Sequence, residues 1–479
     1  MICASATEDS ALLQVAVPLL FLLEICAFYC AWRAVSSART SQGSVGWVVF
    51  LIAVPYVAVP LYLFLGHHKY KGYQISRRES ERVVTAVRNF ATVHAPAKPP
   101  SINPAPFERI ADLPVSRGND MALLINGRAA FDAIFDAIDS AETYVLVRFY
   151  IVRDDTIGRA LRDRMIAAAN RGVKVRFFVD AVGSYGLPHT YFETLLDAGV
   201  EALDPKQTRG PKTRFQLNFR NHRKTVVVDG KIGFTGGLNV GNEYLGESPK
   251  FGNWRDTHVR LHGPVVSQLQ LVFAEDWHWA SGEVLLDELN WDAPYAAADK
   301  TALIVPTGPG DELETGALFF FSAIAAANER VWIASPYCVP DTDVLSALTH
   351  AAIRGVEVRL IVPDVIDHRM PWLAAFAYFD ALRAAGVEIW RYDNGFMHQK
   401  VVLVDRALAA IGTTNLDNRS FRLNFETMAV FFDGVAADEV SEMLENDLTH
   451  AKRLETPLNA QPPLVRIGAP IARLFAPLL

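Results

Sequence analysis

The sequence predicts an α/β fold with two similar halves, preceded by two apolar N-terminal segments. Three observations lead to this prediction. A His-x-Lys-x-x-x-x-Asp motif occurs twice, 176 residues apart, with matching residues after each copy. Apolar runs of strand length alternate with helical patterns from about residue 107 onward. Two stretches near the N-terminus are long and apolar enough to cross a bilayer, and 479 residues suffice for several domains.

The two apolar stretches cover residues 11–32 and 45–65. Glu24 is the one charged residue of the first stretch, and the second stretch has none. Each is about as long as a bilayer-spanning helix, so we expect two transmembrane segments within a membrane anchor of residues 1–70. Pro55 and Pro60 leave open whether the second stretch spans the membrane fully or is re-entrant.

Charges that flank these stretches predict the orientation of the chain. A signal peptide is the alternative for the first stretch, but Glu8 and Asp9 precede it and no Lys or Arg does. A basic cluster follows the second stretch, and basic clusters favour the cytoplasmic side: Lys69, Lys71, Arg77, Arg78 and Arg82. We therefore expect a multi-pass membrane protein with both termini and the bulk of the chain on the cytoplasmic side. The cluster also suits anionic headgroups, with a plain stop-transfer flank as the alternative.

Residues 71–106 combine the basic flank with a proline-rich linker. Five prolines lie among Ala, Lys and Ser in its second part: Pro96, Pro99, Pro100, Pro104 and Pro106. Such a composition is typical of a semi-rigid spacer. We expect it to connect the membrane anchor to the remainder of the chain.

The sequence pattern after the linker predicts two α/β halves, at residues 107–305 and 306–479. The two halves share a pattern of a strand, a helical stretch and a second strand. The expected strands are Val145–Tyr150 and 171–180 in the first half, and Val331–Tyr337 and 354–362 in the second. We expect the boundary between the halves in the Pro/Gly-rich residues Pro306–Gly310.

Composition limits the class of partner. A net charge of -7 argues against a general nucleic-acid binder, and the hydrophobic content of 51% favours a membrane protein. None of the four cysteines forms a Cys-x-x-Cys pair, so the sequence predicts neither a disulfide framework nor a zinc ribbon. His67-His68 and the His278 region do not have the spacing of a metal-ligand set. We therefore expect no metal site.

Each motif places a histidine two residues before a lysine. We expect the catalytic set to comprise His222, Lys224 and Asp229 of the first copy and His398, Lys400 and Asp405 of the second. The alternative for the two aspartates is that they shape the site without contacting substrate. Valine-rich runs follow both lysines, so we expect each His-x-Lys on a strand, with both side chains on one face. An imidazole can attack phosphorus or transfer a proton near neutral pH, and an ammonium neutralises phosphate oxygens.

Each motif is also followed by a turn of small residues and an asparagine that can donate hydrogen bonds to phosphate oxygens. The residues concerned are Gly236, Gly237 and Asn239 in the first copy, and Gly412, Thr413 and Asn415 in the second. Phosphoryl transfer through a covalent intermediate needs both a nucleophile and an acid, whereas each half supplies one histidine. We therefore expect one composite site shared by the two halves. A surface strand with a solvated lysine is the alternative for a single motif.

With these motifs the chain resembles the phospholipase D superfamily, whose members carry the His-Lys-Asp motif twice. The resemblance covers residues 107–479. Within the superfamily the chain is similar to bacterial cardiolipin synthases, as Asn239-x3-Glu243, Trp254-Arg-Asp256-Thr-His258 and Asn415-Leu-Asp-x-Arg419-Ser indicate. The resemblance implies phospholipase D-like α-β-α sandwich halves. It also implies a cofactor-free transfer of a phosphatidyl group between two phosphatidylglycerol molecules, which gives cardiolipin and glycerol through a phosphatidyl-histidine.

The resemblance also implies roles for individual residues. His222 would be the nucleophile and His398 the acid and base, although the near symmetry of the motifs leaves the reverse open. An acid follows each histidine by 28–34 residues in the family and holds the imidazole. Asp256 and Glu426 lie at those distances, with surface ion pairs to neighbouring arginines as the alternative. Many relatives have a hydroxyl residue where this chain has Gly237, so the two halves are expected to bind phosphate unequally.

Other functions remain open from the sequence. Water in place of the lipid alcohol would make the protein a phospholipase or nuclease, and another alcohol such as serine or ethanolamine would give a different transferase. A non-catalytic lipid-binding scaffold is a third possibility, which the two intact His-Lys pairs argue against. Three apolar segments are candidates for lipid contact, with burial in the core as the alternative: Phe319–Phe321, Pro371–Phe379 and Pro470–Leu479. The sequence does not predict the oligomeric state.

Overall fold

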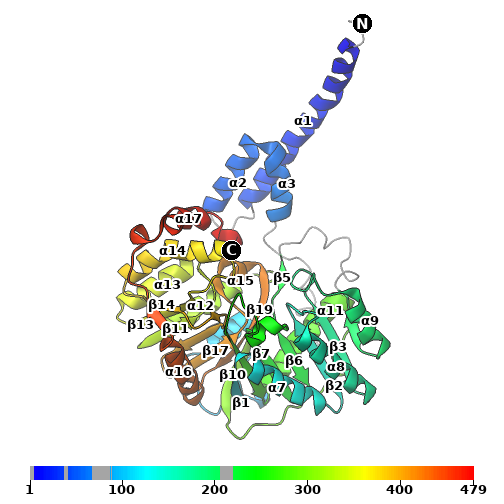
Figure 1. The fold of residues 1–479 in the computed structure, drawn as a ribbon, viewed down its shortest axis with the longest axis vertical. Coiled ribbons are helices and arrows are strands. Elements are labelled where there is room, and N and C mark those ends of the chain that lie inside the picture. Colours follow the sequence, from blue (N-terminus) through cyan, green and yellow to red (C-terminus); the bar gives the residue numbers. More distant parts are fainter. Residues whose placement is uncertain (1–4, 37–40, 67–86, 88, 205–218) are drawn as a thin grey trace. The chain divides into compact units, whose positions relative to one another are not determined.

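The computed structural model describes residues 5–36, 41–66, 87, 89–204 and 219–479. The chain divides into two compact units (Figure 1). The N-terminal unit comprises residues 1–70 and 209–219, and the larger unit comprises residues 71–208 and 220–479. The basic cluster of residues 69–82 and the pair His67-His68 lie outside the described residues.

The N-terminal unit contains three helices, α1 (Ser5–Ser36), α2 (Ser41–Ala53) and α3 (Pro55–Leu65). Within the described part of the chain, one helical segment, Val17–Ser36, is long and apolar enough to cross a membrane. This helical segment overlaps the first predicted transmembrane segment, residues 11–32. The second predicted segment is not a continuous helix, because α2 ends at Ala53 and α3 begins at Pro55.

The helices α2 and α3 fold back on each other. The ring centroids of Trp47 and Tyr62 are 5.1 Å apart, whereas roughly 22 Å would separate these positions along a straight helix. Pro55 has no N–H to continue the hydrogen bonding of α2 and occupies the first turn of α3. The expectation of a second full transmembrane helix is therefore not confirmed, and the geometry is that of a helical hairpin packed against α1.

The first half of the larger unit follows a short helix, α6 (Ala105–Ala111). Its elements are β1 (Ser116–Ile125), α7 (Asn126–Asp139), β2 (Tyr144–Phe149), α8 (Thr156–Asn170), β3 (Lys174–Val179), α9 (His189–Asp197), β4 (Glu201–Leu203), β5 (Arg220–Asn221), β6 (Thr225–Val228), β7 (Ile232–Gly236), η1 (Asn242–Leu245), β8 (Trp254–Arg255), β9 (Thr257–His262) and α11 (Val265–Ser281).

The second half repeats this order and adds elements at its end. Its elements are β10 (Lys300–Thr307), α12 (Thr315–Ala326), β11 (Arg330–Ala334), β12 (Cys338–Val339), α13 (Thr342–Ile353), β13 (Glu357–Pro363), α14 (Arg369–Ala384), β14 (Glu388–Tyr392), β15 (Phe396–Met397), β16 (Val401–Val404), β17 (Leu408–Gly412), β18 (Leu416–Asp417), α15 (Asn418–Arg422), β19 (Asn424–Phe431), α16 (Gly434–Leu448), β20 (Ala451–Arg453), η2 (Leu458–Ala460), α17 (Pro463–Arg473) and η3 (Ala476–Leu478).

One mixed sheet runs through both halves in the order β20-β14-β13-β11-β16-β17-β19-β10-β1-β9-β7-β6-β2-β3-β4. The halves meet where β1 and β10 pair antiparallel, and the order of strands is the same going outward in either direction. Because β10 is the counterpart of β1, the second half begins at Lys300. The expected boundary at Pro306–Gly310 is therefore too late: these prolines and glycines end β10 and do not separate the halves.

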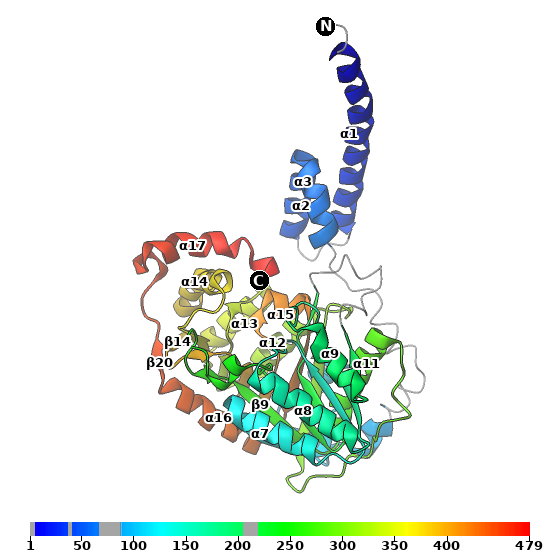
Figure 2. The same cartoon turned by 45° about the vertical axis from the view of Figure 1, so that its right-hand side comes forward.

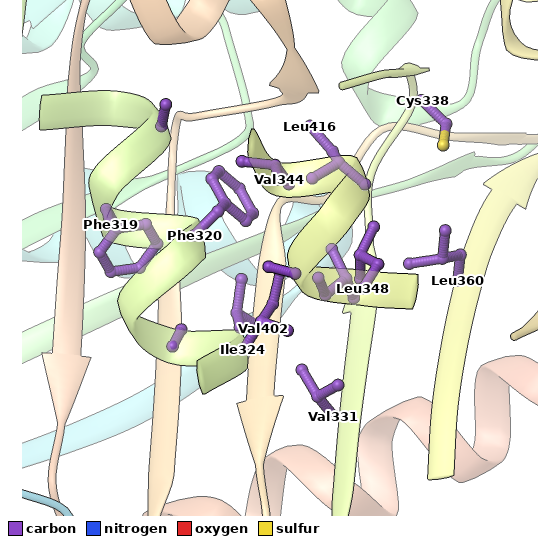
Figure 3. Packing of buried hydrophobic residues seen from close by; sticks show 14 of the residues in the cluster. Phe319, Phe320, Ile324, Val331, Cys338, Val344, Leu348, Leu360, Val402 and Leu416 are labelled. Atoms are coloured by element: carbon purple, nitrogen blue, oxygen red, sulfur yellow. The ribbon is translucent and has the colours of Figure 1, made fainter. Parts of the chain in front are cut away.

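Helices cover both faces of the sheet. The helices α7, α8 and α9 pack on the first half, and α12, α13 and α14 pack on the second half (Figure 2). The helices α11 and α16 share a core with strands of both halves. In Figure 3, Phe319 and Phe320 of α12 and Leu348 of α13 lie against the strands, and these three side chains are buried. Burial therefore explains most of the segment Phe319–Phe321, although Phe321 is exposed.

The proline-rich linker is partly packed onto the larger unit. His94 Nδ1 lies 2.9 Å from the Tyr295 hydroxyl, and Arg117 N donates to His94 O. Ile102 is buried in the core that α12 and α13 form. The expectation of a spacer is wrong for this described portion, because Ile102 between the prolines and His94 before them are held by the fold.

Candidate active site

Both His-x-Lys segments lie at places where the two halves exchange short strands. The strand β5, just before His222, pairs in parallel with β19, and β15, just before His398, pairs in parallel with β8. His222 N donates to Phe425 O, and His398 N donates to Arg255 O. The motifs therefore lie immediately before β6 and β16, not on these strands as expected, because their backbone groups bond to the opposite half.

Each histidine is held by a carboxylate of the other half. His222 Nδ1 lies 2.9 Å from Glu426 Oε2, and His398 Nδ1 lies 2.8 Å from Asp256 Oδ2. Both carboxylates are fully buried, and the histidines are 8% and 7% exposed. Because each carboxylate binds Nδ1, Nε2 is the ring nitrogen left for chemistry. The neighbouring arginines bind elsewhere, Arg255 to Asp447 and Arg422 to Glu314 and Asp341.

The residues beside the two carboxylates differ. Thr413 Oγ1 donates to Glu426 Oε2 at 2.5 Å, so this hydroxyl orients a carboxylate. At the corresponding position of the first half a Cβ on Gly237 would overlap the Asp256 carboxylate. Asp256 Oδ1 instead accepts from Thr257 N at 2.9 Å. A hydroxyl side chain is absent at position 237 because the shorter acid occupies its space.

Both lysines are buried beside their own histidines. Lys224 Nζ donates to His222 O at 2.7 Å. Lys400 Nζ lies 2.9 and 3.0 Å from the two ring nitrogens of His398. Burial and the charge of the other lysine both lower the pKa of Lys224, and burial lowers the pKa of Lys400 to about 8. The two motifs, one from each half, thus form one buried cluster.

Burial also sets the protonation of the histidines. It lowers the pKa of His222, against the opposing effect of Glu426. Burial and the Lys400 ammonium lower the pKa of His398 to about 4. Burial alone would raise the pKa of Glu426 and of Asp256. The charges and hydrogen bonds of the neighbouring histidine, His222 for Glu426 and His398 for Asp256, and of the lysines outweigh burial. The pKa of each carboxyl group is therefore below its usual value. Two neutral imidazoles therefore lie against two ionised carboxylates at neutral pH.

The asparagines and glycines that follow the two motifs differ in their surroundings. The buried Asn239 accepts from Ile151 N and donates to the Tyr244 hydroxyl, while the buried Asn415 has no partner for Oδ1 within the described structure. The glycines Gly236 and Gly412 permit close strand contact. A Cβ on Gly236 would lie 2.5 Å from His258 Cα, and one on Gly412 would overlap Thr427 O. These glycines therefore fit a packing role better than the expected contact with substrate.

The motif aspartates bind backbone far from the histidines. Asp229 accepts from the N–H groups of Glu142, Thr143 and Tyr144, and Asp405 accepts from those of Asn328, Glu329 and Arg330. An intervening strand places each carboxylate roughly 16 Å along the chain from the motif lysine. The expectation that both aspartates belong to the catalytic set is therefore wrong. Both adopt a positive φ, and their hydrogen bonds hold the start of the neighbouring strand in place.

Sequence reasoning missed the residues that anchor the middle of each motif. Arg223 Nη1 lies 2.9 Å from Asp276 Oδ1, and the buried Arg148 pairs with the same carboxylate. In the second half Gln399 Nε2 donates to Asp447 Oδ2 at 2.7 Å. Asp276 and Asp447 are both buried, in the C-terminal parts of α11 and α16. The sequence did contain one indication of such an anchor, because Arg148 is a charged residue within an apolar strand.

Asp276→Ala is expected to destabilise the larger unit by at least about 3 kcal/mol, because it leaves two buried guanidinium groups without their carboxylate. The measurement is the melting temperature of the full chain in one detergent. Asp438→Ala, which removes an exposed pair with Arg406, is the matched control, and we expect a change of about 1 kcal/mol or less. Equal effects of the two substitutions would contradict this account.

The fold and the two crossed His-carboxylate pairs define a phospholipase D-like protein. A family model described as cardiolipin synthase, phospholipase D-like domain, matches residues 134–277 and 320–448. The chain belongs to this family.

Curated relatives agree with this membership, and a solved structure shares the fold. Cardiolipin synthase A of Pseudomonas aeruginosa is 44% identical over 473 residues, which cover 96% of each chain. Cardiolipin synthase A of Pseudomonas putida is 42% identical over 474 residues, 96% of this chain and 98% of its own. A phosphatidylserine synthase structure from Haemophilus influenzae shares the fold, with a TM-score of 0.55, 16% identity, and coverage of 75% of this chain and 95% of that one.

Proposed function

We propose that this protein is a phosphatidyltransferase that converts two phosphatidylglycerol molecules into cardiolipin and glycerol. The observation that carries the proposal is the pair of buried histidines, each held at Nδ1 by a carboxylate of the other half. The similarity over nearly the whole chain to proteins named cardiolipin synthase A supports the choice of substrate.

The first step forms a covalent intermediate. His222 Nε2 attacks the phosphorus of the first phosphatidylglycerol, and the P–O bond to its glycerol headgroup breaks. The leaving oxygen takes the proton of His398 Nε2. In the free protein the pKa of His398 is about 4, and the negative charge of the bound phosphodiester raises it, so that the imidazolium forms next to substrate. Glu426 holds His222 and stabilises the positive charge that develops on its ring.

The second step transfers the phosphatidyl group. The terminal hydroxyl of a second phosphatidylglycerol gives its proton to His398, and its oxygen attacks phosphorus. The P–N bond to His222 breaks and a new phosphodiester forms. One phosphodiester replaces another, so no nucleotide is needed. Lys224 and Lys400 neutralise the phosphate oxygens in both steps, and burial makes this interaction stronger than it is in water.

A hydrolase remains the alternative, and the surroundings of the histidines favour transfer. The Tyr150 ring lies edge-on to His222 with centroids 4.9 Å apart, and the Trp254 ring lies 5.3 Å from His398. These aromatic walls limit water at the reacting atoms. Transfer to another alcohol, such as serine or ethanolamine, uses the same residues.

We place the larger unit on the cytoplasmic side of a bacterial inner membrane, with residues 1–70 as the anchor. Along the chain we place the boundary between the two α/β halves in the residues between α11 and β10. The basic residues 69–82 support this orientation. At 13 and 11 residues, α2 and α3 are each about 20 Å long or less, which is short of a bilayer core. A re-entrant hairpin therefore fits better than a second crossing, and it places the N-terminal tail outside.

Lipid mass spectrometry tests the proposed function. The full chain is reconstituted in phosphatidylglycerol vesicles without added metal or nucleotide, beside His222→Ala. We expect cardiolipin and free glycerol in equal amounts from the unaltered protein and neither from the variant. Phosphatidic acid as the one product would indicate a hydrolase and overturn the proposal. Added serine or ethanolamine that diverts most of the product would indicate a different acceptor.

The pH dependence should report the buried Lys400. Its ammonium is present below its pKa of about 8 and is lost above it. We therefore expect kcat/KM to fall about tenfold per pH unit above pH 8, while kcat falls at higher pH because bound phosphate raises the pKa of Lys400. The measurement uses phosphatidylglycerol in nonionic micelles, which avoid the charge of a vesicle surface. A flat kcat/KM up to pH 10 would contradict this assignment.

A further inference from the structure

The C-terminal helix α17 (Pro463–Arg473) has an apolar stripe that the protein does not cover. Its packed face consists of Val465, Ala469 and Ala472, which are buried. On another side of the helix, at helical spacing, lie large aliphatic side chains that are more than half exposed: Leu464 (76%), Ile467 (61%), Ile471 (53%) and, just past the helix end, Leu474 (78%). Of these side chains, Ile471 and Leu474 lie within Pro470–Leu479, so burial in the core does not hold for this part of that segment.

The charges of α17 point to an anionic partner. The helix carries Arg466 and Arg473 and no acidic residue. On a helical projection both arginines fall between the packed face and the apolar stripe, so they flank the stripe along its length. Arg473 also lies over the Tyr378 ring of α14, 5.1 Å from its centroid. An apolar stripe beside basic side chains is the pattern of a helix that lies in a lipid interface.

The helix is fixed to the body of the larger unit near the candidate site. It packs along α14, where a Cβ on Gly468 would lie 3.2 Å from Leu373 Cδ1 (Figures 1 and 2). The residues after it are held by α15, because Arg419 N donates to Leu479 O at 2.7 Å and Arg419 Nη1 donates to Leu478 O. The helix α15 directly follows the tail of the second motif. The charge of Arg419 acts on Tyr150, whose ring centroid lies 4.9 Å from that of His222. A surface that bound α17 would thus be held near this histidine.

We propose that α17 docks the larger unit on an anionic phospholipid bilayer, with its aliphatic stripe in the headgroup region and Arg466 beside lipid phosphates. A second copy of the chain is a poorer occupant, because two such helices would bring their arginines together with no acidic residue of α17 to pair them. The proposal goes beyond the proposed function, since it concerns how the catalytic unit meets the lipid surface and not what reaction follows.

Photo-crosslinking of the full chain tests the contact without any need for activity. A diazirine analogue of leucine replaces Ile467, and in a matched protein it replaces Ile353, which is 70% exposed at the end of α13. Both proteins are reconstituted in equimolar phosphatidylglycerol and phosphatidylcholine. We expect at least about tenfold more lipid adduct at position 467 than at 353. Equal adduct at the two positions, or a crosslink from 467 to a second chain, would overturn the proposal.

A kinetic comparison separates docking from a structural effect. The variant Ile467→Gln/Ile471→Gln/Leu474→Gln is expected to lose at least about fivefold in rate on vesicle phosphatidylglycerol at limiting lipid. Its rate on a short-chain phosphatidylglycerol below the micelle concentration should equal that of the unaltered protein, as should both rates of Ile353→Gln. Equal losses on both substrates would make α17 a structural element only. If the unaltered protein makes no cardiolipin, the proposed function fails and the crosslinking result still decides docking.

Discussion

His222→Ala and His398→Ala are each expected to lower kcat by at least about 10⁴-fold. The first substitution removes the nucleophile, so no phosphatidyl-enzyme can form. The second removes the acid, so the glycerol alkoxide would have to leave without a proton. Because both act on one phosphorus, the double variant should be little worse than either single variant.

The measurement is the rate of cardiolipin formation from phosphatidylglycerol by the full chain, with melting temperatures to verify folding. Asp405→Asn is the matched control, since this motif residue binds backbone at the far end of β16. We expect it to alter stability more than kcat. Two independent sites would give a different result, in which each single variant keeps about half the activity.

Glu426→Gln and Asp256→Asn should each lower kcat by roughly 10³–10⁴-fold, although both amides can be accommodated in similar space. A carboxylate accepts the Nδ1–H of its histidine and leaves Nε2 free to attack or to transfer a proton. An amide can donate to Nδ1 and so favour the wrong tautomer. It also no longer stabilises the imidazolium.

The crossed pairing predicts which step each substitution slows. Glu426→Gln acts through His222 and should reduce the formation of the covalent intermediate in a single turnover. Asp256→Asn acts through His398 and should slow the steps that need proton transfer. Nitrogen-15 NMR of the histidine rings reads the pairing without turnover: Glu426→Gln should shift the Nδ1 signal of His222 and leave that of His398 nearly unchanged. The reverse pattern would contradict the crossed arrangement.

The sequence alone predicted those features of the fold that depend on local patterns of residues. The valine-rich runs became β6 and β16, and the duplicated order of elements became two similar halves of one sheet. The motif histidines and lysines could be named because two matched copies of one rare spacing exclude coincidence. The family resemblance named Asp256 and Glu426 as acids that follow His222 and His398, and in the structure each acid contacts the histidine of the other motif.

The remainder depends on contacts between distant segments. The exchange of β5 and β15 between halves decides that each acid serves the other half's histidine, and no spacing within one half contains that information. Likewise, Gly237 looked like a missing phosphate ligand, whereas its position is occupied by the Asp256 carboxylate. The fold of α2 back on α3 and the exposure of α17 also depend on packing and not on composition.

The number and place of the covalent intermediates test the central claim most directly. The full chain is mixed with phosphatidylglycerol, quenched during the first turnover, digested and mapped by mass spectrometry. A composite site with one nucleophile predicts at most one phosphatidyl group per chain, attached to His222. Comparable labelling of His222 and His398, approaching two groups per chain, would contradict it.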